Sequence, residues 1–163
     1  MRNYMSLNNT ISGTTVVKLM EYSSQVESLL LKSNLPISDL PKVEELKFFG
    51  IFVDEKLAGV VGLELHDSSG LLRSLAVEEE YKNKGFGKIL VGYLEGWALN
   101  HGIKKIYLLT LIASEFFRFL GYETIPRSQA PDAIAKTTQF CELCPCSSGA
   151  ILMRKVLEYP NIW

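Results

Sequence analysis

A strand, a glycine-punctuated loop and an amphipathic helix follow one another in the middle of this chain and constrain its fold most. Residues 72–77 (Leu-Arg-Ser-Leu-Ala-Val) read as a strand, and from Gly87 onward apolar residues recur at the spacing of one helical face. Gly102 suits the left-handed position that ends a helix. The first turn of this helix offers backbone N–H groups and the positive end of the helix dipole, with three lysines nearby. The stretch therefore predicts an anion site, above all for phosphate.

Two common phosphate-binding motifs are excluded by the residues at key positions of this loop and of the helix start. A dinucleotide-binding fingerprint needs a third glycine where Leu90 stands. A P-loop needs a glycine at the position of Lys82 and a Ser or Thr at the position of Ile89. The remaining pattern, Lys82-x-x-Gly85-x-Gly87 behind an apolar strand, resembles the pyrophosphate loop of the GCN5-related N-acetyltransferases (GNAT family). The alternative is a strand joined to a surface helix by a solvated, lysine-rich turn.

The resemblance implies that the loop amides hold the pyrophosphate of acetyl-CoA and that strand backbone pairs with the pantetheine arm. Lys82 stands where the family usually has Arg or Gln, and it keeps a hydrogen-bond donor there. The acetyl-CoA-binding residues implied by the resemblance are Leu75, Ala76, Val77, Lys82, Asn83, Lys84, Gly85, Phe86, Gly87, Lys88, Thr110 and Phe117.

The order of the expected elements agrees with this resemblance. Strands are expected at residues 14–20, 48–53, 57–65, 71–77, 104–111, 122–125 and 149–157, and helices after Ser23, at 38–46, from Gly87, at 113–120 and at 131–140. The pattern predicts an α+β domain with a mixed sheet. The resemblance implies a GNAT-like, mostly antiparallel, twisted sheet flanked by helices, in which a splayed parallel strand pair forms the acetyl-CoA cleft. One domain is expected over residues 14–157, with tails at 1–13 and 158–163.

A second family signature follows the expected strand at 104–111. Ala113, the pair Phe116-Phe117 and the step Gly121-Tyr122 fit it. Thr110 stands where the family usually has an Asn that contacts coenzyme A, and its hydroxyl remains a donor. Phe117 stands where a Tyr often serves as general acid, so that acid must come from elsewhere, and Tyr107 and Tyr122 are the candidates.

Within the family, two sets of residues resemble the N-acetyltransferases of bacterial arsenic-resistance operons. The first comprises Gly62-Leu63-Glu64, residues 71–77 and residues 107–110, and the second comprises Phe140, Leu143-Cys144-Pro145 and Met153. The likeness indicates kinship more than it indicates a substrate.

Three sets of residues are candidates for activating or contacting the amine that accepts the acetyl group. Glu64, near a strand end, is a candidate base, because acetyl transfer needs an unprotonated amine; the alternative is a solvent-facing carboxylate. Arg73 and Ser74 are expected to point to opposite faces of their strand, and Arg73 needs either Glu64 or a ligand anion. Cys144 is a candidate for lining the acceptor site, or a small buried hydrophobe.

The composition argues against several other classes of protein. The chain has 163 residues, 47% of them hydrophobic, and a formal charge of −1, so no global field favours nucleic acid or an anionic membrane. No spanning apolar run and no signal-peptide core are visible, which by default predicts a cytoplasmic protein. The three cysteines, Cys141, Cys144 and Cys146, are clustered and odd in number, while the two histidines are isolated, so neither a disulfide framework nor a metal site is expected.

We therefore expect an acetyl-CoA-dependent N-acetyltransferase that transfers the acetyl group to the primary amine of a small, amino-acid-like or arsenical molecule by direct attack. The rival hypotheses are a non-catalytic acyl-CoA-binding module, favoured by Phe117, and a cysteine-based arsenical or metal binder. The oligomeric state stays open, a homodimer included.

Overall fold

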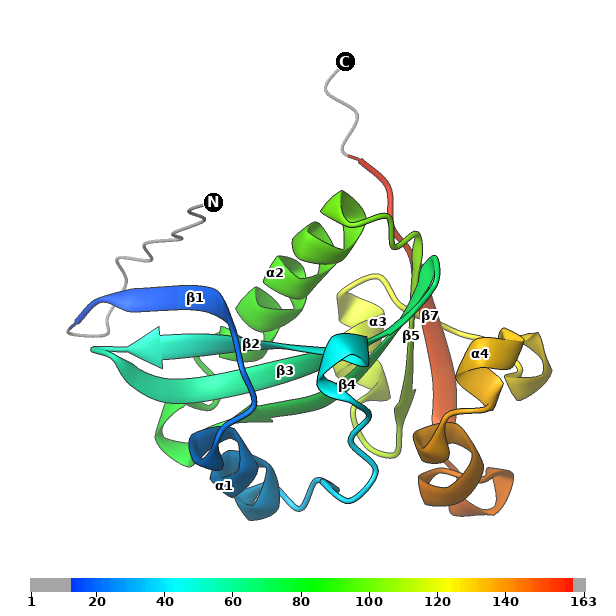
Figure 1. Cartoon of the computed structure of the whole chain (residues 1–163), viewed down its shortest axis with the longest axis horizontal. Helices are drawn as coiled ribbons and strands as arrows, with labels where there is room; N and C mark the ends of the chain where they lie inside the picture. Colours follow the sequence, from blue (N-terminus) through cyan, green and yellow to red (C-terminus); the bar gives the residue numbers. More distant parts are fainter. Residues whose placement is uncertain (1–12, 160–163) are drawn as a thin grey trace. The chain divides into compact units, whose positions relative to one another are not determined.

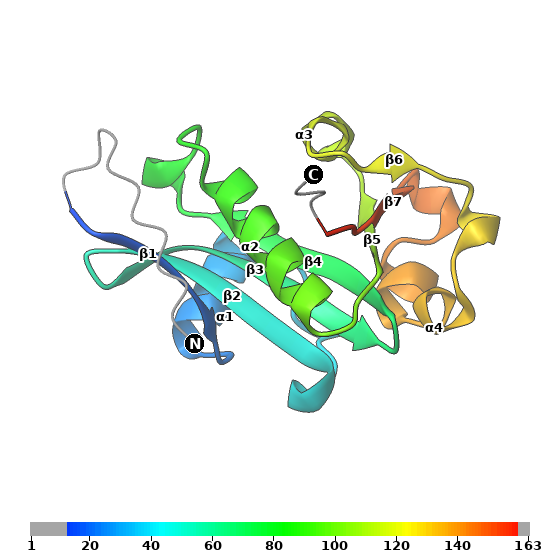
Figure 2. The ribbon, with the colours of Figure 1, turned by 90° about the horizontal axis from the view of Figure 1, so that it is seen from above.

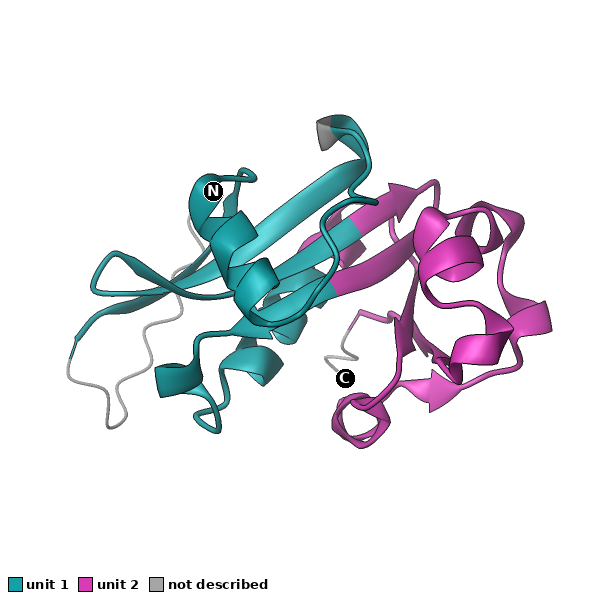
Figure 3. Cartoon of the chain, turned by 90° about the horizontal axis from the view of Figure 1, so that it is seen from below, with its two compact units in different colours: residues 1–63, 74–96 teal, residues 64–73, 97–163 magenta. Residues whose placement is uncertain are grey.

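The computed structural model describes residues 13–159, apart from the side chain of Val43, and these residues form two compact units (Figure 3). Within the described residues, unit 1 consists of 13–63 and 74–96, and unit 2 of 64–73 and 97–159. Strands β3 (Lys56–His66) and β4 (Ser69–Val77) each continue from one unit into the other. The expected tails lie mostly outside the described residues, and the expectation of a single domain stays a prediction.

The sheet has seven strands in the order β1-β2-β3-β4-β5-β7-β6, with a parallel β4–β5 pair, as expected for the predicted fold class (Figures 1 and 2). The strands are β1 (Thr15–Met20), β2 (Leu46–Val53), β3 (Lys56–His66), β4 (Ser69–Val77), β5 (Lys105–Thr110), β6 (Glu123–Thr124) and β7 (Ile151–Val156). The helices are α1 (Ser24–Lys32), α2 (Phe86–Asn100), α3 (Ser114–Phe119) and α4 (Asp132–Ala135).

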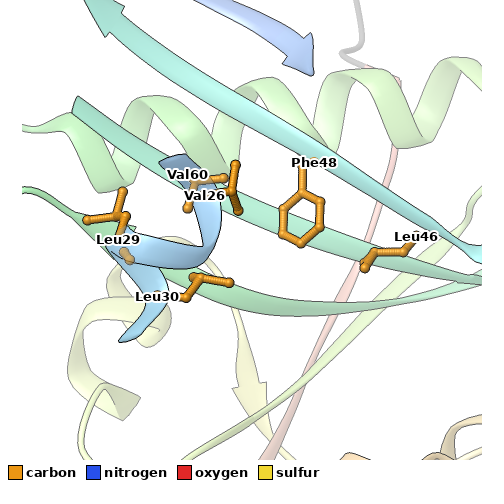
Figure 4. Close-up of a cluster of buried hydrophobic side chains, with 7 residues drawn as sticks. Val26, Leu29, Leu30, Leu46, Phe48 and Val60 are labelled. Atoms are coloured by element: carbon orange, nitrogen blue, oxygen red, sulfur yellow. The ribbon is translucent and has the colours of Figure 1, made fainter. Parts of the chain in front are cut away.

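In unit 1, α1 and the first part of α2 lie on opposite faces of the strands (Figures 1 and 2). The α1 face buries Val26 and Leu30 against Phe48 of β2 and Val60 of β3 (Figure 4). On the other face, Tyr93 of α2 packs edge-on against Phe49, with ring centroids 5.8 Å apart. Neighbouring strand residues therefore serve two cores, as the alternation of side chains along a strand requires.

A helix cap and a tight turn define the ends of elements in unit 1. The Oγ of Ser23 accepts the N–H of Val26 at 3.4 Å and caps α1. Asp54 (φ +49°) and Glu55 (φ +68°) link β2 to β3, and two consecutive residues with positive φ make the tight turn that suits a hairpin.

In unit 2, β4 and β5 run parallel, with Ser69 opposite Lys105 and Leu71 opposite Tyr107. Both strands continue beyond this ladder, to Val77 and to Thr110. Strand β7 pairs antiparallel with β5 along its whole length. The core of this unit comprises Leu71, Tyr107, Ile125, Ile134 and Leu152.

The segment between β6 and β7 is tied to Arg127. Its guanidinium donates to the carbonyl oxygens of Phe140 (3.0 Å), Cys144 (2.5 Å) and Ala150 (3.3 Å) and lies 4.2 Å from the centre of the Phe140 ring. One cation thus satisfies three carbonyls of a segment without long regular structure.

Two helix predictions were wrong in extent. Residues 38–46 contain only a 3-10 turn at Val43–Glu45, because Pro41 lacks an N–H and disfavours helical geometry in the residue before it. The helix expected at 131–140 breaks after Ala135, and a π-helical turn follows at Gln139–Leu143.

Candidate active site

The loop between β4 and α2, residues 78–85, and the first turn of α2 together have the features of an anion site. A 3-10 turn at Glu79–Tyr81 follows β4. Phe86 is buried and stacks on Tyr81, with ring centroids 5.5 Å apart and planes 13° from parallel. This contact anchors the first turn of α2 to the loop.

The first turn of α2 contains backbone donors without an intrahelical acceptor. The first helical bond runs from the N–H of Ile89 to the carbonyl of Gly85, at 3.1 Å. The N–H groups of Phe86 and Gly87 therefore precede the first intrahelical donor. Gly85 has φ +82°, and a side chain there would meet open space but would need a left-handed backbone.

The lysines of the loop stay close to the surface. Lys82 forms an ion pair with Glu79 at 2.9 Å and its side chain is half exposed. The ammonium of Lys84 lies 5.8 Å from the centre of the Tyr81 ring. These are weak, solvent-screened contacts that an incoming anion can replace.

The end of β4 departs from a regular strand. Ser74 has φ +57°, a left-handed conformation that is uncommon outside glycine and interrupts strand geometry. Arg73 and Ser74 are both buried, and only after Ser74 does burial alternate, with Ala76 buried between the half-buried Leu75 and Val77. The side-chain alternation of a regular strand is therefore interrupted at Ser74.

The residues after β5 contain the second sequence signature, which includes Ala113, Phe116-Phe117 and Gly121-Tyr122. The Oγ1 of Thr110 accepts the N–H of Ala113 at 2.9 Å, which leaves the hydroxyl proton as a donor. Phe117 is buried and packs edge-on against Tyr122, with ring centroids 5.5 Å apart.

The two candidate acids, Tyr107 and Tyr122, are both buried. The Tyr107 hydroxyl is hydrogen-bonded to Arg154. The hydrogen bond to the Glu123 carboxylate raises the pKa of Arg154, so this partner of Tyr107 stays charged. Of the two tyrosines, Tyr122 is the one that contacts Phe117.

Glu64, Arg73 and His66 form one buried polar cluster. Arg73 Nη1 donates to Glu64 Oε1 at 2.6 Å, and His66 Nε2 lies 3.0 Å from Glu64 Oε2. The side chains of Arg73 and Glu64 are 1% and 5% exposed, whereas that of His66 is 18% exposed. Glu64 is thus a buried partner of Arg73. The sequence indicated that His66 is isolated, whereas in the structure it contacts Glu64.

Cys144 is half-buried, and its carbonyl is held by Arg127, while Cys141 and Cys146 are exposed. Within the described part of the chain, no group of three or more His, Cys, Asp or Glu could hold a metal ion. No helix between residues 13 and 159 is both long and apolar enough to span a membrane.

The predicted site residues are distributed over both units. Unit 1 contains Ser74, the backbone of residues 75–77 and the expected pyrophosphate-binding residues 82–88. Unit 2 contains Glu64, Arg73, Thr110, Phe117 and Cys144. Sequence reasoning missed the partnership of His66 with Glu64, although the Glu-x-His spacing puts both side chains on one face of a strand. It also missed Arg127, for which no local pattern exists.

The comparisons with known proteins agree with this picture. The model of the "Acetyltransferase (GNAT) family" matches residues 19–122. An uncharacterised N-acetyltransferase of Chlorobaculum tepidum is 39% identical over 74 residues, which are 45% of this chain and 45% of that protein. An amino-acid acetyltransferase of Pseudomonas syringae pv. tomato is 36% identical over 72 residues, 44% of this chain and 17% of that protein. The matched region thus spans less than half the length of either relative.

Solved structures share the fold at low identity. N-acetylglutamate synthase from Neisseria gonorrhoeae, complexed with coenzyme A and L-arginine, superposes with a TM-score of 0.68 at 18% identity over 88% of this chain and 34% of that one. A Mycobacterium tuberculosis protein in complex with CoA superposes with a TM-score of 0.68 at 21% identity over 88% of this chain and 99% of that one.

Proposed function

Because the chain belongs to the GNAT family of acetyltransferases, we propose that it is an acetyl-CoA-dependent N-acetyltransferase acting on the primary amine of a small molecule. The observation that carries this proposal is the first turn of α2, whose N–H groups at Phe86 and Gly87 follow a left-handed Gly85. Such a turn binds pyrophosphate oxygens through backbone donors and the helix dipole.

Residues 82–88 would hold the pyrophosphate, and the backbone of Leu75–Val77 would pair with the pantetheine amide. Thr110 would donate its hydroxyl proton, and Phe117 would supply an apolar contact. Acetyl-CoA, when bound, supplies an activated acetyl thioester. An N–H of the β4 backbone near Leu75 would stabilise the oxyanion that forms on attack by the amine.

The acceptor in this proposal carries both a primary amine and an anionic or arsenical group. The likeness to enzymes of arsenic-resistance operons supports this class, as does the cation Arg73 within an apolar strand. The 2.6 Å ion pair with Glu64 means that an acceptor anion would share Arg73 with that carboxylate. A guanidinium carries five donors in a fixed fork and can bind two anions in a defined bidentate geometry, which the point charge of an ammonium does not provide.

The first test concerns the loop. Gly87→Val adds a branched side chain where the backbone must approach phosphate closely, so we expect CoA binding to be lost while the fold remains. Titration calorimetry with CoA and circular dichroism measure the two effects. Wild-type affinity in a folded variant would contradict the assignment of the loop.

The second test concerns the acceptor. Thiol release and product mass should be followed with acetyl-CoA and three classes of amine: amino acids, organoarsenicals and neutral monoamines. We expect turnover with the anionic classes, and Arg73→Lys should raise the acceptor KM more than that of acetyl-CoA, because the fork is lost. Efficient acetylation of neutral monoamines, unchanged by Arg73→Lys, would leave Arg73 as a structural ion-pair partner.

A non-catalytic acyl-CoA-binding module is the second candidate, because Phe117 occupies the usual general-acid position and packs edge-on against the buried Tyr122. Such a module would bind CoA and release no thiol with any amine.

A further inference from the structure

Unit 1 contains an open pocket of about 570 Å³ that the proposed reaction does not use. It is lined by the end of β1 and the turn after it (residues 19–22), by Ile37, Leu40 and Pro41 of the segment between α1 and β2, and by the start of β2 (residues 46–48). A volume of about 300–1,000 Å³ is typical of sites for small ligands. The described lining residues lie outside β4 and residues 78–88, so the pocket is separate from the expected pyrophosphate-binding residues.

The inner wall of this pocket is apolar. Leu46 and Phe48 belong to the hydrophobic cluster on the α1 side of the sheet (Figure 4), and Met20, Ile37 and Leu40 pack against the same cluster. Apolar side chains around an open volume favour an apolar ligand group, because the group and the wall are then both removed from water.

One aromatic side chain of the wall is held in place from two sides. The ring centroid of Tyr22 lies 5.8 Å from that of Phe48, and the Tyr22 hydroxyl donates to Glu27 Oε2 at 3.0 Å. The hydroxyl proton of Tyr22 is thus already used within the protein, which leaves the charged residues of the pocket to bind the polar groups of a ligand.

The pocket contains one residue of each charge, Glu21 and Lys47. Both adjoin Met20 and Phe48, the last residue pair of the β1–β2 ladder, so they start from the same end of that ladder. Glu21 is exposed and Lys47 is half-buried. Within residues 13–159, neither side chain forms an ion pair or a hydrogen bond with another residue. A carboxylate and an ammonium are therefore both available to a ligand.

We propose that this pocket binds an α-amino acid with a large apolar side chain, as a second ligand site of the protein. The apolar side chain contacts the inner wall, the ammonium group of the ligand pairs with Glu21, and its carboxylate pairs with Lys47. A ligand with a single charge would leave one of these two residues beside an apolar group without a counter-charge, which is unfavourable. This inference goes beyond the proposed acetyl transfer and does not depend on it.

The first experiment compares ligands that share one apolar group and differ in charge. L-Phenylalanine, phenethylamine and 3-phenylpropionate are titrated into the protein in the absence of acetyl-CoA. We expect L-phenylalanine to bind about 5-fold more tightly than either singly charged compound, and glycine, which has the same charges without the apolar group, not to bind measurably. Equal affinity for all three phenyl compounds, or no binding of L-phenylalanine at millimolar concentration, would overturn the proposal.

Two charge-removing variants should give opposite patterns. Glu21→Gln should weaken the binding of L-phenylalanine and phenethylamine and leave that of 3-phenylpropionate unchanged. Lys47→Gln should weaken the binding of L-phenylalanine and 3-phenylpropionate and leave that of phenethylamine unchanged. The matched controls are Glu45→Gln and Lys42→Gln, because both residues are exposed and neither lines the pocket. Losses as large in the controls as in the pocket variants would overturn the proposal.

The location of the bound ligand is tested by NMR of methionine methyl groups labelled with carbon-13. Met20 lines the pocket, whereas Met153 is fully buried in unit 2. L-Phenylalanine should shift the Met20 resonance and leave that of Met153 in place. Leu40→Trp, which fills the pocket, should abolish both the shift and the binding. Binding that persists in folded Leu40→Trp, or that shifts Met153 instead of Met20, would overturn the proposal.

Discussion

At the scale of single residues, the buried Arg73–Glu64 pair affects the stability of the fold as well as the proposed reaction. Both side chains are at most 5% exposed, so neither charge is hydrated if its partner is removed. Removing one member of such a pair is strongly destabilising, whereas replacing both by neutral groups of similar volume is much less so. Stability and turnover must therefore be measured together for any change at Glu64.

We expect Glu64→Gln to lower the free energy of unfolding by about 3–5 kcal/mol, because it leaves the Arg73 charge uncompensated. The double variant Glu64→Gln with Arg73→Met should be more stable than Glu64→Gln alone. Urea unfolding of the four proteins of this cycle measures the coupling. Glu115→Gln is the control, since Glu115 forms an exposed pair with Arg118 and should matter little. A double variant less stable than Glu64→Gln would contradict this account.

The residue scale is also where prediction from sequence fell short. A buried Arg in an apolar strand requires an anion, and that much was predictable; the choice between Glu64 and a ligand was not. The choice depends on strand pairing, which places residues nine positions apart within 2.6 Å. Arg127 was missed for the same reason, because its acceptors lie 13 to 23 positions along the chain.

At the scale of elements, α1 shows how a short helix depends on its cap. It has nine residues, and its start is defined by the Ser23 side chain. We expect Ser23→Ala to cost about 1 kcal/mol in the free energy of unfolding, because the N–H of Val26 loses its acceptor. Urea unfolding measures the effect.

Ser28→Ala is the control for the cap, because Ser28 lies on the exposed side of the same helix. Alanine favours a helix interior, so this change should be neutral or slightly stabilising. Equal losses in the two variants would remove the capping argument.

Elements with a clear period were predicted well. The expected strand at 14–20 is observed as Thr15–Met20, and the helix expected at 113–120 as Ser114–Phe119. The segments at 38–46 and 131–140 were assigned as helices from a few apolar residues. The first contains a 3-10 turn and the second the four-residue α4 followed by a π-helical turn, and both are shaped by prolines and by packing on distant strands. Local patterns carry no information about such packing.

At the scale of the whole molecule, the two compact units share β3 and β4. Strands that continue through both units should make unfolding cooperative, because neither unit can lose these strands alone. We expect Leu30→Ala in unit 1 and Ile134→Ala in unit 2 each to shift one common transition, at a cost of about 2–5 kcal/mol. Both side chains are fully buried.

Circular dichroism and hydrogen exchange measured through the urea transition test this expectation. Coincident curves for peptides from both units would support a single folding domain. A variant that loosens only its own unit would indicate two domains.

The left-handed Ser74 gives β4 an unusual mutational profile. Elsewhere along a buried strand, Val and Ile are the best tolerated replacements and Gly the worst. At φ +57° this ranking reverses, since Gly, Asn and Asp accept the conformation whereas β-branched side chains clash. In a library of all substitutions along β4 that is selected for folded protein, Gly, Asn and Asp should therefore be enriched at position 74 and depleted at the neighbouring positions. This pattern would identify the interruption of the strand without an activity assay.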